Sequence, residues 1–120
     1  MAKVSSACGP VRVIDVTSLV GSLDKSKWPE SPEITVAHVE AAEKAHGALK
    51  AGDIVLFRTG HLDTHFKPSP DDKGVWLDPL AGKSEGWPAP GPDVIVYLKS
   101  KGIRCVGTDA PDLGGVNPRR

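Results

Sequence analysis

The sequence predicts an α/β fold, in which a single domain carries one sheet flanked by at least two helices. The chain has 120 residues, the usual size of one domain, and its 39% hydrophobic and 25% charged residues suit a folded protein. Its apolar runs and amphipathic segments follow the order strand, helix, strand, loop, helix, strand. Helices between strands favour parallel neighbours in the sheet.

The first half of the chain contains two predicted strands with a helix between them. Residues 11–16 are a β-branched run typical of a strand, and the prolines of residues 25–32 indicate an extended loop. In residues 35–49 apolar side chains recur at spacings of three and four, which predicts an amphipathic helix capped by Thr35. Residues 53–59 contain the densest apolar run of the chain, with apolar residues on both faces, and this predicts a strand buried on both faces.

The second half begins with residues 60–90, a long loop rich in proline and glycine in which we expect little regular structure. Three aromatic side chains within it indicate that the loop packs on the domain. Residues 92–101 predict a helix, residues 103–108 another strand, and residues 109–120 a terminal loop. The side chains of the helix expected to face inward are Val94, Ile95, Tyr97 and Leu98.

Charge and cysteine usage exclude several classes of function. Fifteen Lys and Arg balance fifteen Asp and Glu, so no surface for nucleic acid or an anionic membrane is expected. Apolar runs are far shorter than the roughly 20 residues of a membrane span. The first ten residues lack an apolar signal segment, and Cys8 and Cys105 lie far apart, so we expect a reducing cytoplasm.

Polar residues follow two of the predicted strands, where sites of α/β proteins usually lie. His61 and His65 flank Asp63, a combination that could contribute ligands to a divalent metal, although a zinc site needs three or four. The alternative is that both histidines are exposed loop residues. Asp109 could face a substrate, or it could cap the backbone of its own turn. Nucleotide-binding and serine-hydrolase loop motifs are absent from the sequence.

Three blocks of the sequence stand out together: residues 52–60 (GDIVLFRTG), 87–93 (WPAPGPD) and 102–111 (GIRCVGTDAP). In this order they resemble the middle of the cyclase family, which includes kynurenine formamidase and isatin hydrolase, and the resemblance extends over residues 9–118. It implies a partial swivelling β/β/α-type fold with a mixed sheet. It also implies hydrolysis of an amide or lactam bond by water that a divalent ion, Zn²⁺ or Mn²⁺, activates.

The metal-binding motif of the family, His-x-Gly-Thr-His-x-Asp, has no match in residues 1–10, where the resemblance would place it. Residues 61–67 echo the motif, but Asp63 replaces its glycine and Lys67 its aspartate, so we regard the echo as coincidence. The family's later His and Glu would lie beyond Arg120. We therefore expect one incomplete cyclase-like domain over residues 1–120, with no catalytic residue or metal ligand of its own and no activity alone.

The resemblance leaves six candidates for the lining of a pocket that holds a small-molecule amide. They are His61, Asp63, His65, Trp76, Trp87 and Asp109. Kynurenine formamidase-like chemistry would place the complete enzyme in tryptophan catabolism. The uncovered apolar surfaces of a partial sheet favour association with a second copy or a complementing chain. Two alternatives remain: a non-catalytic binding module or subunit that uses residues 60–90, and an independent metal enzyme built on His61 and His65.

Overall fold

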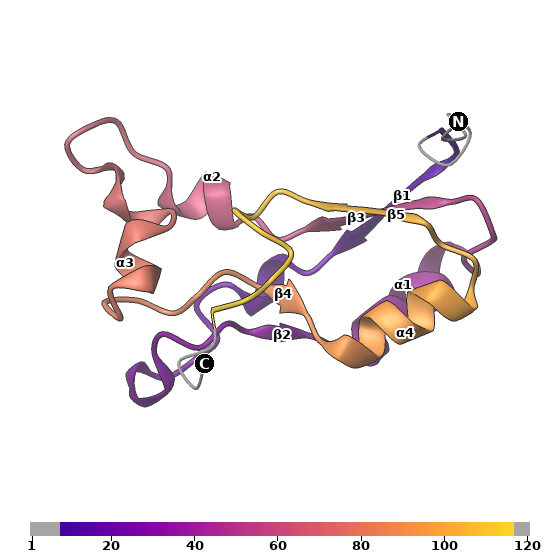
Figure 1. Ribbon diagram of the computed structural model, residues 1–120, viewed down its shortest axis with the longest axis horizontal. Coiled ribbons are helices and arrows are strands. Elements are labelled where there is room, and N and C mark those ends of the chain that lie inside the picture. Colours follow the sequence, from indigo (N-terminus) through magenta and orange to yellow (C-terminus); the bar gives the residue numbers. More distant parts are fainter. Residues whose placement is uncertain (1–7, 117–120) are drawn as a thin grey trace.

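The computed structural model describes residues 8–116, and its centre is a three-stranded parallel sheet (Figure 1). The strand order is β1-β3-β5, in which Val11 pairs with Ile54 and Ile54 with Cys105. The three strands are β1 (Val11–Asp15), β3 (Ile54–Arg58) and β5 (Cys105–Thr108). This confirms the predicted α/β class and its parallel strands. Every strand pairing among residues 8–116 is parallel, so the mixed sheet that the resemblance implied is not found within these residues.

Two helices, α1 (Val36–His46) and α4 (Pro92–Ser100), lie side by side against one face of this sheet (Figure 1). A second parallel sheet, which was not predicted, joins β2 (Glu33–Ile34) to β4 (Ala89–Pro90). No helix of the described chain is long and apolar enough to cross a membrane. The remaining short elements are η2 (Thr17–Leu19), η3 (Lys25–Lys27), α2 (His61–His65), η4 (Asp72–Gly74) and α3 (Leu77–Leu80).

Residues 60–90, where we expected a long loop with little regular structure, contain four short elements. These are α2, η4, α3 and β4, none longer than five residues. A single helical turn has no amphipathic repeat to detect, and it is stable only when the rest of the protein anchors it. Figure 1 shows α3 as part of a lobe at the end of the molecule away from α1 and α4.

The hydrophobic core lies between the sheet and the two long helices. Alternate strand residues point into it, among them Ile14 on β1 and Val55 and Phe57 on β3, each at most 2% exposed. The helices contribute Val39 from α1 and Val94 and Leu98 from α4 to the same core. The prediction that Ile95 faces inward is wrong: its side chain is 47% exposed, because it lies about 100° around α4 from Val94.

The opposite face of the sheet is open, which corrects the prediction that residues 53–59 are buried on both faces. Val11 and Val13 are each 53% exposed, and Leu56 on β3 is 36% exposed. Leu56 is opposite Val13 and Gly107 in the ladder, so these residues form one continuous apolar strip. A Cβ atom at Gly107 would lie 2.7 Å from the Leu56 side chain, so glycine lets Leu56 lie across β5.

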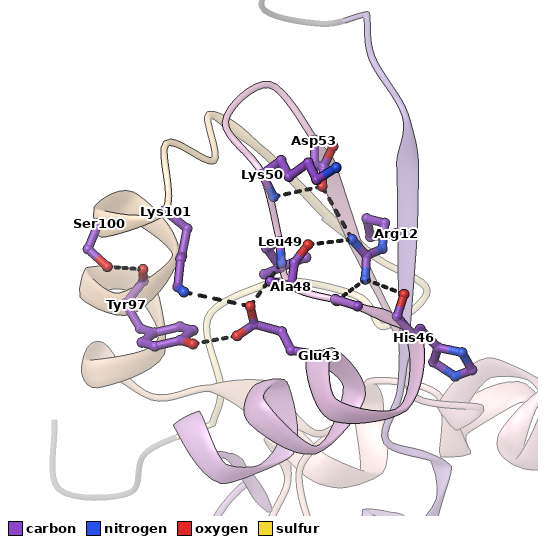
Figure 2. Close-up of polar contacts among 11 residues, drawn as sticks. Arg12, Glu43, His46, Ala48, Leu49, Lys50, Asp53, Tyr97, Ser100 and Lys101 are labelled. Carbon is purple, nitrogen blue, oxygen red and sulfur yellow. Dashed lines mark hydrogen bonds and ion pairs between the residues drawn. The ribbon is translucent and has the colours of Figure 1, made fainter.

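Helix α1 begins as predicted, with Thr35 as its N-cap and the backbone amide of Thr35 donating to His38 Nδ1 at 2.9 Å. It ends at His46, three residues before the predicted end, because Gly47 adopts a positive φ of 99° that L-residues avoid. The Arg12 guanidinium on β1 donates to the carbonyls of His46, Gly47 and Ala48 (Figure 2). A cation at this end complements the helix dipole.

Glu43 links the two long helices (Figure 2). Its carboxylate accepts hydrogen bonds from the Tyr97 hydroxyl and from the Leu49 amide, and Lys101 Nζ lies 3.7 Å from it. Burial alone would raise the pKa of Glu43, but these hydrogen bonds and the lysine outweigh it and lower the pKa. The same contact raises the pKa of Tyr97 to about 12, first because the phenol donates to Glu43 and then because of burial.

We expect the folded protein to show a phenol titration near pH 12 instead of the ordinary pH 10. Tyr97 is the only tyrosine, so absorbance at 295 nm after a rapid pH jump reports it alone. Because the folded pKa is raised, the stability from this contact is complete below pH 10 and is lost as the pH rises through 12. Glu43→Gln should move the midpoint toward 10, whereas Glu40→Gln should move it little. A wild-type midpoint at 10 would contradict the contact.

Candidate functional site

The candidate site lies at the carboxyl edge of the three-stranded sheet. Because all three strands are parallel, β1, β3 and β5 end at the same edge, with Asp15, Arg58 and Thr108 as their last residues. Ligands of α/β proteins bind outside this edge. The chain leaves it through the two segments singled out in the sequence, which start at Gly60 and Asp109.

Asp109 joins the ends of β3 and β5. Its Oδ1 accepts hydrogen bonds from the Thr59 amide at 2.8 Å and the Thr59 hydroxyl at 2.6 Å, and its Oδ2 accepts the Gly60 amide at 2.9 Å. Burial would raise the pKa of Asp109, but the hydrogen bonds from Thr59 and Gly60 outweigh it and lower the pKa. Asp109 therefore holds the loop that follows the neighbouring strand β3. The sequence alone suggests a contact with substrate or a cap on its own turn.

His61 is the buried residue of α2, only 1% exposed, which rules out the interpretation of His61 as an exposed loop residue. Its amide donates to the Thr59 hydroxyl at 3.1 Å, and its Nε2 lies 2.7 Å from the Val75 carbonyl oxygen. A carbonyl only accepts, so we assign the proton to Nε2. The contact anchors α2 to the chain that follows η4.

His65 lies one helical turn beyond His61, and the two ring centroids are 4.6 Å apart at an interplanar angle of 48°. Burial lowers the pKa of His65, and the neighbouring His61 ring and Lys67 lower it further, against an opposing effect of Glu85. The His65 imidazole is therefore neutral at physiological pH. A neutral, half-buried imidazole at a sheet edge can accept a proton or a hydrogen bond from a bound molecule.

The other pocket candidates separate into buried and exposed residues. Trp87 is 6% exposed, meets the His61 ring edge-on at 6.2 Å between centroids, and donates Nε1–H to the Gly114 carbonyl at 3.0 Å. Trp76 is 50% exposed and Asp63 is also exposed. The structure thus brings the rings of His61, His65 and Trp87 together and leaves the side chains of Trp76 and Asp63 exposed.

Glu85 was missed in the sequence, although its side chain is buried close to this cluster. It is 7% exposed, and its carboxylate accepts the Gly21 and Leu23 amides, the latter at 3.1 Å. These bonds tie the segment after η2 to the segment before Trp87. No local pattern distinguishes Glu85 from an exposed loop glutamate, because its partners lie more than 60 residues away.

An exposed ion pair completes the edge. Arg58 Nη1 lies 3.3 Å from Asp15 Oδ2, with the two side chains 61% and 54% exposed. Asp15 Oδ1 accepts the Thr17 amide and hydroxyl, and these hydrogen bonds, together with Arg58, lower the pKa of Asp15. Such exposure keeps the pair's contribution to stability small. It leaves Arg58 accessible to a negatively charged molecule at the edge.

The divalent ion implied by the family resemblance does not fit the His61–His65 pair. The pair can supply two imidazole nitrogens at most, whereas a zinc site needs three or four ligands, and Asp63 between the two histidines is exposed. Within residues 8–116, no group of three His, Cys, Asp or Glu side chains is placed to hold a metal ion.

Comparison with known proteins gives the family. The family described as Putative cyclase matches residues 2–114. An isatin hydrolase of Roseibium aggregatum is 32% identical over 120 aligned residues, which cover 96% of this chain and 41% of the relative. This chain therefore spans less than half of that relative's length.

Solved structures agree with this relationship. A crystal structure of an isatin hydrolase bound to the product analogue thioisatinate superposes with a TM-score of 0.60 at 26% identity, covering 90% of this chain and 37% of that one. Isatin hydrolase A from Labrenzia aggregata, bound to benzyl benzoate, gives 0.61 at 25% identity, covering 89% and 37%. A crystal structure of a novel cyclase gives 0.64 at 23% identity, covering 90% and 32%. The chain belongs to the cyclase family.

Proposed function

We propose that this chain provides the framework and one pocket wall of a hydrolase that opens an amide or lactam bond. The observation that carries the proposal is the 32% identity with an isatin hydrolase over 96% of the chain. His65 at the carboxyl edge supports it, because this half-buried imidazole, packed beside the buried His61 ring, can exchange a hydrogen bond with a bound amide or lactam. The substrates to test first are isatin and N-formylkynurenine, the latter relevant to tryptophan catabolism.

The metal-binding residues of the complete enzyme, in this proposal, lie outside residues 8–116. Zn²⁺ or Mn²⁺ would supply the activated water there. The side chains of the described chain would contact the organic part of the substrate.

The open face of the sheet supports an association with further protein. Val11, Val13 and Leu56 form an apolar strip on the side away from α1 and α4. Such a face is normally covered by a second layer. We propose that a complementing part of a cyclase domain, or a second copy of the chain, covers it. Free thiols at Cys8 and Cys105 fit the cytoplasmic location that we propose for the protein.

The test is hydrolysis by the purified chain, alone and co-expressed with the part of an isatin hydrolase that the match leaves uncovered. Amide hydrolysis yields a carboxylic acid, so a pH-stat measures turnover of either substrate. With Mn²⁺ or Zn²⁺ we expect no turnover by the chain alone, and turnover together with a co-eluting complex when the complement is present. The complement without this chain is the control. Metal-dependent turnover by the chain alone would contradict the division of roles, and no turnover in any combination would contradict the hydrolase.

A further inference from the structure

We propose that Asp109 is a positioning residue of the candidate site, and that it sets the place of the His61–His65 pair by holding the turn at Thr59 and Gly60. The use of this pair in a hydrolase rests on the proposed function. The contacts by which Asp109 would position the pair lie within this chain and can be tested without a substrate or a metal.

Asp109 acts on the loop after β3 and is not needed to pair the strands. The β3–β5 ladder runs from Ile54 opposite Cys105 to Phe57 opposite Thr108, so the two strands are already joined before Asp109 is reached. All three of its bonds go to the two residues that follow β3. These hydrogen bonds therefore fix the backbone of Thr59 and Gly60, where the chain leaves β3.

Helix α2 depends on how the chain leaves β3. The helix has five residues, too few to be stable by itself, and its N-cap Gly60 has no side chain to cap it. Gly60 adopts a left-handed φ of 72°. Glycine has access to many backbone conformations, and the hydrogen bond from its amide to Asp109 selects this one. The Gly60 carbonyl then accepts both the Thr64 amide and the Thr64 hydroxyl.

Thr59 connects the turn after β3 to the two histidines of α2. Because the Thr59 hydroxyl donates to Asp109, its lone pairs remain to accept the His61 amide at 3.1 Å. His61 then contacts the ring of His65 and the Val75 carbonyl. A continuous set of contacts therefore runs from the end of β5 to the imidazole pair on α2.

Carboxylate chemistry is essential to this role. A carboxylate accepts through both oxygens, and three donors converge on this one. In Asp109→Asn one of the two atoms becomes an NH₂ group, which would face an amide N–H. We therefore expect hydrogen exchange of the amide that faces the new NH₂ group, Thr59 or Gly60, to accelerate by about 10-fold or more, since its hydrogen bond to a charged group is lost. The ¹⁵N resonances of the His61 and His65 rings should shift with it.

Three matched variants separate positioning from general stability. Asp93→Asn changes an exposed carboxylate at the start of α4, away from the contacts described above, and it should leave the imidazole resonances unchanged. Val39→Ala weakens the core without touching the loop and should leave them unchanged even with a larger loss of stability. Thr59→Val removes the hydroxyl and should accelerate exchange of the His61 amide, whereas Thr59→Ser retains the hydroxyl and should behave as wild type.

The outcomes decide between the two roles. Imidazole shifts in Asp109→Asn that Val39→Ala lacks support positioning. Equal shifts in both variants would reduce Asp109 to a structural bond, and unshifted imidazoles in Asp109→Asn would overturn the proposal. If Asp109→Asn does not fold, the Thr59→Val and Thr59→Ser pair gives the same decision, since identical behaviour of the two would overturn it. None of these readouts depends on turnover, so failure of the hydrolase proposal remains distinguishable.

Discussion

Phe57→Ala is expected to lower the free energy of unfolding by about 3–5 kcal/mol, the largest loss that a single truncation produces in this core. Phe57 lies on the central strand, is 1% exposed and is the largest fully buried side chain of the described residues. Its removal leaves a cavity between the sheet and the helices, in addition to the lost transfer free energy. Small domains have about 5–15 kcal/mol in total, so much of the stability disappears. Urea unfolding followed by tryptophan fluorescence measures the loss.

Phe66→Ala is the matched control, because it makes the same chemical change at a side chain that is 66% exposed. We expect its effect on the free energy of unfolding to stay within about 0.5 kcal/mol. The difference between the two variants isolates burial from side-chain chemistry. Similar losses in both, or a loss below about 1 kcal/mol for Phe57→Ala, would contradict the assignment of the core to the helix-covered face of the sheet.

The main elements could be predicted because their signals are local. The β-branched run before Asp15, the repeat of residues 35–49 and the apolar run after Gly52 correspond to β1, α1 and β3. Errors at their ends have local causes as well. Leu49 continues the helical repeat and is buried, but it reaches the core from the loop after α1, since Gly47 ends the helix.

The face of the sheet and the contacts of the site could not be predicted, because both depend on residues far apart in the chain. An apolar run is compatible with burial on one face or on two, and only the placement of α1 and α4 on the same side of the sheet leaves Leu56 open. The burial of His61 depends on Val75 and Trp87, and that of Glu85 on the Gly21 turn. The sequence placed Asp109 at the end of a strand, but its donors come from the neighbouring strand.

Trp87→Ala is expected to lower the free energy of unfolding by about 3–5 kcal/mol and to displace His61. Trp87 is 6% exposed, its ring covers the edge of the His61 ring, and its indole N–H is bonded to Gly114. Truncation removes the apolar contact and the link between the segment before β4 and the C-terminal loop. Urea unfolding followed by far-UV circular dichroism measures the stability, and the ¹⁵N resonances of His61 report the displacement.

Two further variants resolve what Trp87 contributes. Trp87→Phe keeps an aromatic ring but loses the bond to Gly114, so we expect a loss of about 1 kcal/mol from the hydrogen bond plus a smaller cavity effect than alanine produces. Trp76→Ala truncates a tryptophan that is 50% exposed and should cost much less than Trp87→Ala. If Trp76→Ala were the more damaging change, the assignment of Trp87 to the buried cluster with His61 would be contradicted. A dominant effect of Trp87→Ala, together with shifted His61 resonances, shows that Trp87 holds His61 in place.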